Sequence, residues 1–232
     1  SRRQFLGNSG KIASASALAG ITLPVVHGKS GDETKLALVG CGGRGTGAAS
    51  NALSVSQANG PVKLVAMADV NRAKLDRSYN GLINKHKEQI QVPEDQKFIG
   101  FDGYAKAMDL LDPGDVVIFT TPCAFRWVHF QYAIKRGLNV FMEKPVTADG
   151  YSSRKMLELN EEAKKINLKV GIGLMCRHSQ ARRELKDRIA NGELGEILNM
   201  RAYRMQGAIA SCFSDKKPVG EDELAYQISN FH

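Results

Sequence analysis

Residues 35–45 read Lys-Leu-Ala-Leu-Val-Gly-Cys-Gly-Gly-Arg-Gly, a short apolar run that ends in a glycine cluster. Such a run is typical of a strand that is buried on both faces of a parallel sheet. The glycines satisfy the pattern G-x-G-x-x-G, and residues 46–55 after them favour a helix. A strand, a glycine loop and a helix in this order predict a site for the pyrophosphate of a dinucleotide.

The glycines of this loop have separate roles in such a site. Gly40 permits the tight turn, Gly42 lets the backbone approach the pyrophosphate, and Gly45 allows the helix to pack closely on the strand. Gly43 and Arg44 complete the predicted cofactor loop.

An acidic residue follows the second predicted strand, residues 62–68. The carboxylate of Asp69 can accept hydrogen bonds from an adenosine ribose and would repel a 2′-phosphate, which favours NAD over NADP. Arg72 could instead neutralise such a phosphate, and Asp69 could cap the helix that follows. Both alternatives stay open at this point.

Further strands and helices alternate along the chain. Strands are expected over residues 115–120, 139–142 and 169–174, with a short one over 97–99. Phe125, Val128 and Tyr132 repeat at helical spacing before Gly137, and residues 156–166 repeat that spacing. The alternation predicts βαβ units, and therefore a Rossmann-type, doubly wound α/β sheet over residues 31–175.

The pattern changes after residue 175. Residues 181–189 predict a helix that ends at Asn191-Gly192, and residues 198–203 alternate between apolar and polar side chains, as in a half-buried strand. We therefore expect residues 176–232 to begin a second, incomplete α/β domain.

The tripeptide Glu143-Lys144-Pro145 follows the fourth long strand, at the sheet edge where ligands bind. Pro145 keeps Lys144 out of the helical region, and the bond between them could be cis. A lysine beside a nicotinamide can bind a substrate hydroxyl and stabilise the alkoxide as hydride leaves the carbon, and Glu143 could orient it. A lysine in this position is also commonly a plain surface residue.

These motifs together resemble the Gfo/Idh/MocA oxidoreductases, which include glucose–fructose oxidoreductase and inositol dehydrogenase. The resemblance runs from about Lys35 to Tyr203 and rests on the glycine loop, Ala68-Asp69-Val70, Thr121-Pro122 with His129, residues 137–145, and Gly171-Ile172-Gly173 followed by Arg177-His178. It implies a Rossmann domain followed by an α/β domain with a mostly antiparallel sheet. It also implies oxidation or reduction of sugars, polyols and related carbinols with NAD or NADP.

The resemblance carries roles over to single residues. Lys144 would be the active-site lysine, Thr121 and Pro122 would line the nicotinamide side, and Arg177 would stand near the cofactor at the domain junction. His129 is at least as well explained by packing as by cofactor contact, and a hinge or ion-pair role is an equal alternative for Arg177 and His178. Trp127 could line the pocket or lie in the helix core, and the core is favoured.

One part of the family pattern is missing. No closely spaced Asp and His follow Arg177-His178, so we expect the catalytic acid/base beyond residue 232, in a longer protein that forms a homo-oligomer.

The N-terminal residues predict an export signal. Arg2 and Arg3 precede a weakly apolar stretch, residues 12–26, as in a twin-arginine signal. We expect residues 1–30 to direct export to the periplasm; a basic N-terminal arm is the alternative.

The composition excludes several classes of protein. With 232 residues, 43% of them hydrophobic and 24% charged, the chain is neither coiled coil nor mainly disordered. The net charge of +8 has no basic block beyond the N-terminal segment, so we expect no nucleic-acid partner. No apolar run beyond that segment would span a membrane, and the four cysteines lack metal-site spacing.

The leading hypothesis is an NAD(P)-dependent oxidoreductase that acts on the CH–OH group of a sugar or polyol. Two alternatives stay open: an NAD-dependent glycosidase-like enzyme of the same family, and a non-catalytic nucleotide-binding fragment.

Overall fold

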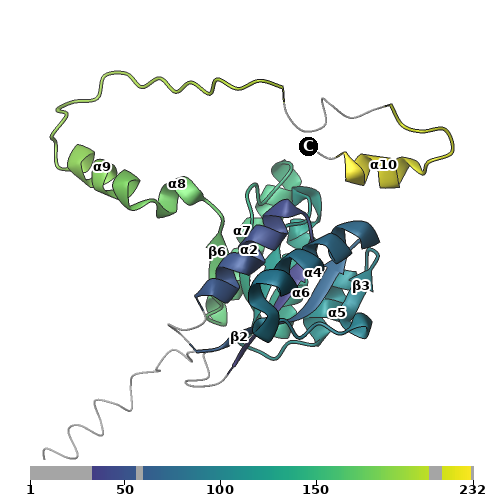
Figure 1. The fold of residues 1–232 in the computed structure, drawn as a ribbon. Helices are drawn as coiled ribbons and strands as arrows, with labels where there is room; N and C mark the ends of the chain where they lie inside the picture. Colours follow the sequence, from purple (N-terminus) through teal and green to yellow (C-terminus); the bar gives the residue numbers. More distant parts are fainter. Residues whose placement is uncertain (1–32, 56–59, 209–215, 231–232) are drawn as a thin grey trace, which may run out of the picture.

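Six parallel strands form the centre of the molecule in the order β3-β2-β1-β4-β5-β6. The computed structural model describes residues 33–55, 60–208 and 216–230. The strands are β1 (Thr34–Val39), β2 (Val62–Asp69), β3 (Lys97–Ile99), β4 (Val116–Phe119), β5 (Asn139–Met142) and β6 (Val170–Ile172). The strand order turns back between β1 and β4, which is the doubly wound, Rossmann-type arrangement that the sequence predicts (Figure 1).

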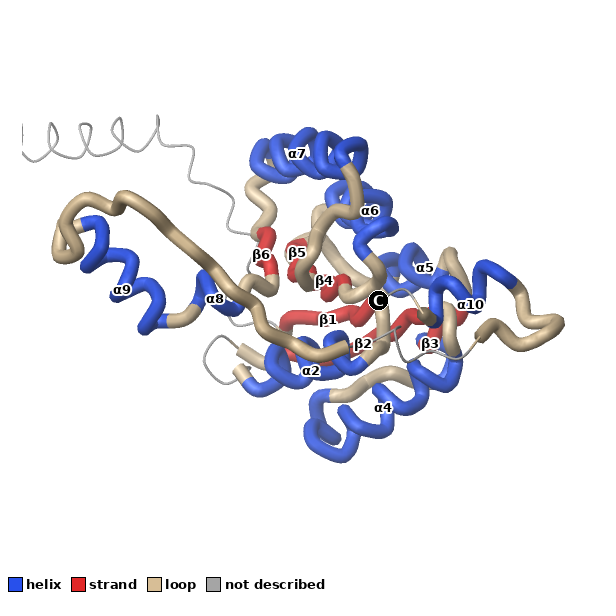
Figure 2. The backbone as a smooth tube through the Cα atoms, turned by 90° about the horizontal axis from the view of Figure 1, so that it is seen from above, coloured by secondary structure: helices blue, strands red, loops and turns tan. Residues whose placement is uncertain are grey.

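Helices cover both faces of this sheet. Figure 2 shows α2 (Gly43–Ser54) and α4 (Arg72–His86) on one side, and α5 (Gly103–Asp109), α6 (Arg126–Arg136) and α7 (Gly150–Lys165) on the other. Short 3₁₀ turns occupy Lys87–Gln89, Glu94–Gln96 and Cys123–Phe125. The predicted helices over 46–55, 125–132 and 156–166 are therefore confirmed, each as part of a longer helix.

Two hydrophobic cores lie on the two faces of the sheet because successive strand residues point to opposite sides. Leu36 and Leu38 of β1 pack toward α2 and α4, whereas Ala37 and Val39 pack toward α5 and α6. Trp127 packs against the second of these cores, as the sequence favours. Each fully buried leucine contributes roughly 1.5–3 kcal/mol to folding.

Side chains or a glycine cap three of these helices at their ends. Gly137 ends α6 in the left-handed conformation at φ 69°, as predicted. Asp149 and Ser152 form a reciprocal capping box at the start of α7. The cap of α4 is Asn71, whose side chain accepts a hydrogen bond from the Lys74 amide at 3.0 Å. The cap that Asp69 could have provided is therefore supplied by Asn71.

Residues 174–208 and 216–230, called here the C-terminal segment, contain no buried residue. The segment includes α8 (Met175–His178), α9 (Gln180–Ala190), which confirms the helix predicted over 181–189, and α10 (Glu223–Ser229). In Figure 1, α8, α9 and the stretch after them extend away from the layered body, whereas α10 lies beside it.

The half-buried strand predicted over 198–203 is wrong. These residues adopt no regular structure, and Leu198 and Met200 are 86% and 83% exposed. An alternating pattern forms a strand only where a sheet pairs with it and buries one face. Among the described residues no strand pairs with this stretch, and the second-domain sheet stays a prediction.

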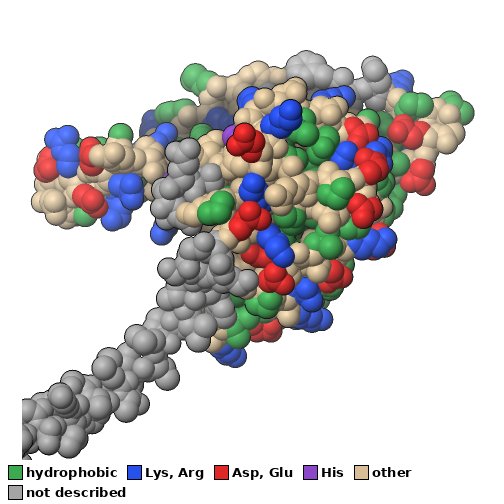
Figure 3. Space-filling model, turned by 60° about the horizontal axis from the view of Figure 1, so that its bottom comes forward, with side chains coloured by type: hydrophobic (Ala, Val, Ile, Leu, Met, Phe, Trp, Pro, Cys, Tyr) green, Lys and Arg blue, Asp and Glu red, His purple; other side chains and the backbone are tan. Residues whose placement is uncertain are grey.

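The surface of the body carries both signs of charge. Figure 3 shows Lys and Arg side chains interspersed with Asp and Glu over the face that it displays. Within the described ranges, no helix has the length and apolar character needed to cross a bilayer. The expected export segment, residues 1–30, lies outside the described residues.

Candidate functional site

A cleft of about 550 Å³ opens at the carboxyl ends of β1, β2, β4 and β5. It lies at the point where the strand order reverses, which is where doubly wound sheets bind ligands. Most of the predicted site residues line it: Gly40, Gly42, Gly43, Arg44, Gly45, Asp69, Thr121, Pro122, Glu143 and Lys144. Arg72 and Arg177 do not.

The glycine loop is packed tightly on one side and open on the other. A Cβ on Gly40, which has φ 96°, would stand 2.7 Å from the Thr121 amide nitrogen, and a Cβ on Gly45 would stand 2.5 Å from Thr120 Oγ1. A Cβ on Gly42 would meet nothing within 4 Å. The first two glycines thus permit close packing, whereas Gly42 leaves room for a ligand in the cleft.

The start of α2 presents amide groups to the same space. Gly42 is the N-cap residue of this helix, and no side chain caps it. Free amides and the positive end of the helix dipole favour an anion at this position. The pyrophosphate of a dinucleotide fits this cradle.

Asp69 holds the glycine loop against the end of β2. Its Oδ2 accepts a hydrogen bond from the Cys41 amide at 2.6 Å, and its Oδ1 accepts one from the Asn71 amide at 2.8 Å. A carboxylate has about four lone-pair positions, so Asp69 retains capacity for ribose hydroxyls.

Arg72 is engaged elsewhere. Its Nε donates to Asp76 at 2.8 Å, and its Nη2 pairs with Glu94. The carboxylates of Asp76 and Glu94 neutralise the charge of this guanidinium outside the cleft. Arg72 is therefore poorly placed to bind a 2′-phosphate.

Arg126, which sequence reasoning missed, joins the two loops at the other end of the cleft. Its side chain is 3% exposed, and it donates from Nε to the Thr121 carbonyl at 2.8 Å and from Nη1 to the Glu143 carbonyl. Burial lowers the pKa of Arg126 to about 10. Its spacing from His129 and Phe130, on the apolar face of α6, was the signal available in the sequence.

His129 combines packing with a polar contact. It is buried, its Nδ1 lies 3.2 Å from Thr121 Oγ1, and its ring centre lies 4.3 Å from that of Tyr104. Burial, and then the nearby Arg126 charge, lower its pKa to about 4. The imidazole is therefore neutral at pH 7, and it also lines the cleft.

Lys144 lies exposed at the edge of the cleft, and the Lys144–Pro145 bond is cis, as the sequence allowed. Glu143 could orient Lys144, but no ion pair joins the two side chains among the described residues. The Glu143 carboxylate lies instead against Gly173, where an added Cβ would stand 2.7 Å from Oε1. The missing side chain at Gly173 leaves the room that Glu143 occupies.

The C-terminal segment contributes to the cleft in a way the sequence did not suggest. Arg177 lies exposed on α8 outside the cleft, and His178 Nε2 lies 3.1 Å from the Ile172 carbonyl oxygen. Ile228 and Ser229 of α10, in contrast, are part of the cleft lining.

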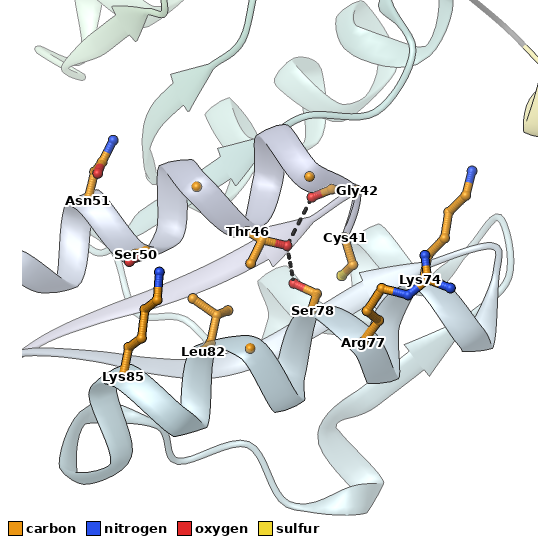
Figure 4. Close-up of a pocket in the computed structure, with 13 residues that line it drawn as sticks. Cys41, Gly42, Thr46, Ser50, Asn51, Lys74, Arg77, Ser78, Leu82 and Lys85 are labelled. Atoms are coloured by element: carbon orange, nitrogen blue, oxygen red, sulfur yellow. Dashed lines mark hydrogen bonds between the residues drawn. The ribbon is translucent and has the colours of Figure 1, made fainter. Parts of the chain in front are cut away.

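A second groove of about 620 Å³ runs between α2 and α4 (Figure 4). Thr46 Oγ1 donates to the Gly42 carbonyl at 3.0 Å and lies 2.7 Å from Ser78 Oγ, which ties the two helices together. Lys74 and Arg77 lie at one end of the groove and Lys85 at the other. Gly42, Gly43 and Lys74 line both the groove and the cleft.

No set of three metal-ligating side chains occurs among the residues that the structure describes. Cys41 and Cys123 are buried free thiols and Cys176 is an exposed one; Cys212 lies outside the described residues.

Comparison with known proteins also indicates a Rossmann fold that binds NAD. The family model described as "Oxidoreductase family, NAD-binding Rossmann fold" (GFO_IDH_MocA) matches residues 34–172. An inositol 2-dehydrogenase of Leifsonia xyli subsp. xyli is 26% identical over 117 residues, which cover 50% of this chain and 34% of that protein. The chain therefore spans about a third of the length of this curated relative.

Two solved structures share the fold. The myo-inositol 2-dehydrogenase of Lactobacillus plantarum has a TM-score of 0.55 at 24% identity, covering 72% of this chain and 43% of its own. The scyllo-inositol dehydrogenase of Lactobacillus casei, solved with NAD(H) and scyllo-inositol, has a TM-score of 0.53 at 23% identity, covering 71% and 43%.

Proposed function

The chain belongs to the Gfo/Idh/MocA oxidoreductases, the family with an NAD-binding Rossmann fold, and on that premise we propose that its cleft binds a nicotinamide dinucleotide for hydride transfer. The substrate is a sugar, a polyol such as an inositol, or a related carbinol. NAD is preferred to NADP.

One observation carries this proposal: the uncapped start of α2 opens at Gly42 between Asp69 and the loop that bears Lys144. The amides favour the pyrophosphate, Asp69 favours a free ribose hydroxyl, and the β4–β5 side is left for the nicotinamide. The lining of the groove between α2 and α4 includes neither Asp69, Thr121 nor Lys144, so the groove offers no such arrangement.

The chain's own residues divide the work of the reaction. When bound, the nicotinamide ring supplies the hydride acceptor or donor. The Lys144 ammonium donates a hydrogen bond to the substrate oxygen and stabilises negative charge on it. Thr121 and Pro122 hold one wall of the cleft. The proton would be moved by a separate acid/base group.

Cofactor binding can be tested by fluorescence titration with NADH and NADPH. A Cβ at Gly42 would meet nothing within 4 Å, and the side chain of Gly42→Leu would enter the cleft, so the variant should fold but lose NADH affinity by at least about tenfold. Gly47→Leu is the matched control, because this α2 position also has open space but lies outside the cleft. Equal NADH affinity in wild type and Gly42→Leu would refute the site.

The role of Lys144 can be tested by turnover measurements with a panel of inositols and sugars. Lys144→Met should reduce turnover by about a hundredfold or more, with a much smaller change in NADH affinity. Unchanged turnover in this variant would remove Lys144 from the reaction.

We also propose export by the twin-arginine route, on the strength of Arg2 and Arg3 ahead of the apolar stretch. A reporter fused after residue 30 should reach the periplasm, and Arg2→Lys with Arg3→Lys should retain it in the cytoplasm. Export that persists in the double variant would contradict this route.

A further inference from the structure

Arg126 is a buried cation whose hydrogen bonds go to main-chain carbonyls and not to a carboxylate. Its guanidinium donates to the Thr121 and Glu143 carbonyl oxygens. No ion pair includes it among the described residues, whose ion pairs all join other side chains. The Glu143 charge acts on Arg126 but does not offset the effect of burial, which lowers the Arg126 pKa. Burial of a charge that no ion pair compensates is costly, so a cation kept here points to a use in the cleft.

The position of Arg126 places it on the nicotinamide side, an argument that rests on the proposed function. Asp69 at the end of β2 marks the adenosine side, and the pyrophosphate lies at the start of α2. The nicotinamide end is then left to the loops after β4 and β5, which Arg126 connects and whose cleft it lines.

Of the other charged groups at this end, only Glu143 opposes the Arg126 charge, and burial outweighs it in setting the Arg126 pKa. His129 is neutral at pH 7 because its pKa lies at about 4, whereas Arg126, with a pKa of about 10, stays protonated. Lys144 is exposed, so water and salt screen its charge more strongly than that of a buried group. Glu143 is the one acidic residue at this end of the described lining.

We propose that the buried guanidinium of Arg126 makes the cleft bind the reduced dinucleotide more tightly than the oxidised one. The nicotinamide ring is positively charged in the oxidised form and neutral in the reduced form, so a fixed cation repels only the oxidised ring. Each tenfold preference for the reduced form raises the potential of the bound two-electron couple by about 30 mV. Arg126 thereby favours withdrawal of hydride from the substrate.

The test measures the dissociation constants of NADH, by fluorescence titration, and of NAD⁺, by competition, at pH 7. The expected ratio of the NAD⁺ to the NADH constant is about ten or more in wild type, and Arg126→Gln lowers it by about three- to tenfold. Arg126→Lys keeps the charge and loses the forked hydrogen bonds, so it preserves most of the ratio. A positioning role alone would instead affect both forms alike.

Arg44→Gln is the matched control, because Arg44 is a cleft cation beside the pyrophosphate. It should weaken NADH and NAD⁺ binding by similar factors and leave their ratio unchanged. Glu143→Gln tests the proposal from the opposite direction. It keeps the main-chain carbonyl to which Arg126 donates and removes the negative charge that opposes Arg126, so the ratio should increase. Circular dichroism verifies the fold of each variant.

The outcomes separate this inference from the proposed function. A folded wild-type chain that binds neither dinucleotide contradicts both. If both forms bind, and neither Arg126→Gln nor Glu143→Gln changes the ratio of the NAD⁺ to the NADH constant, the inference alone is contradicted. The inference is also contradicted if Arg126→Lys lowers this ratio as much as Arg126→Gln does.

Discussion

Two glycines of α2 differ sharply in what surrounds them, although they are only two positions apart. A Cβ on Gly45 would overlap the Gly40 carbonyl and approach Thr120 Oγ1, whereas a Cβ on Gly47 would meet nothing within 4 Å. Gly45→Ala should therefore lower the free energy of unfolding by about 3 kcal/mol. Gly47→Ala should raise it by about 0.5–1 kcal/mol, because alanine favours a helix more than glycine does.

Urea unfolding of the two variants beside wild type measures both effects. Equal stability of the two alanine variants would mean that α2 does not pack on β1 and β4 as closely as the structure shows.

Asp69 sets the choice between NAD and NADP in the proposed function. Asp69→Asn keeps the size of the side chain and removes the charge that would repel a 2′-phosphate. We expect the affinity for NADPH relative to NADH to rise about tenfold. Parallel fluorescence titrations give this ratio, and a variant with the wild-type ratio would contradict the assignment. Arg72→Gln serves as the control that should leave the ratio unchanged, because Arg72 pairs with Asp76 and Glu94.

At the scale of single residues, the sequence predicts contacts of the backbone better than contacts of side chains. The glycine pattern requires a definite loop conformation, so Gly40, Gly42 and Gly45 could be assigned roles in advance. Arg126 could not, because its partners are main-chain carbonyls of two separate loops. The orientation of Glu143 depends on the space beside Gly173, which no local pattern reveals.

The buried, neutral imidazole of His129 in α6 makes the free energy of unfolding depend on pH. Burial, and then Arg126, lower its pKa to about 4 from an ordinary 6.5. Between these pH values the unfolded chain binds a proton that the folded chain does not, so the free energy of unfolding rises with pH. The contribution is complete above about pH 6.5 and is lost toward pH 4, by up to about 1.4 kcal/mol per pH unit.

Urea unfolding at pH 5 and pH 7.5 isolates this effect when wild type is compared with His129→Asn. The variant should lose less stability than wild type on acidification. If both lose the same amount, His129 does not titrate differently in the folded protein.

The contact between α2 and α4 depends on a pair of hydroxyl groups. Thr46 donates to the Gly42 carbonyl, so Ser78, which is buried, donates to Thr46. Thr46→Val leaves the Ser78 hydroxyl without this partner and should cost about 1–2 kcal/mol. Ser54→Ala, which removes only an exposed bond to the Ser50 carbonyl, should cost much less. Thermal unfolding measures both, and similar losses would argue against a special role for the Thr46–Ser78 pair.

At the scale of elements, the long strands of the sheet centre were the clearest to predict. The predicted strands over 62–68, 115–120 and 139–142 correspond to β2, β4 and β5, because continuous apolar runs identify strands that are covered on both faces. The prediction over 198–203 failed because its alternating pattern depends on a neighbouring sheet. The helix α5 was not predicted, since its short sequence, Gly103–Asp109, gives little periodicity.

At the scale of the whole molecule, the layered body and the C-terminal segment should differ in resistance to proteolysis. Residues 174–208 include none that is buried and only Ser179 and Ile189 that are half-buried. Brief trypsin digestion should therefore cleave first within this stretch, which contains Arg183, Arg188 and Arg201. Mass spectrometry should find a persistent fragment that retains Lys35 to Gly173.

The same digestion in urea provides the control, because the unfolded body should then be cleaved throughout. Protection of Arg201 equal to that of Lys135 in α6 would show that the C-terminal segment is packed more firmly than its exposure indicates.

The position of β1 has a consequence for isotope exchange. This strand lies between β2 and β4, is hydrogen-bonded on both sides, and buries Leu36 to Val39 almost completely. Its amides can meet deuterated solvent only when the whole sheet opens. Their exchange rates should therefore report the global free energy of unfolding in plain buffer, and each substitution above could be measured at β1 without any denaturant.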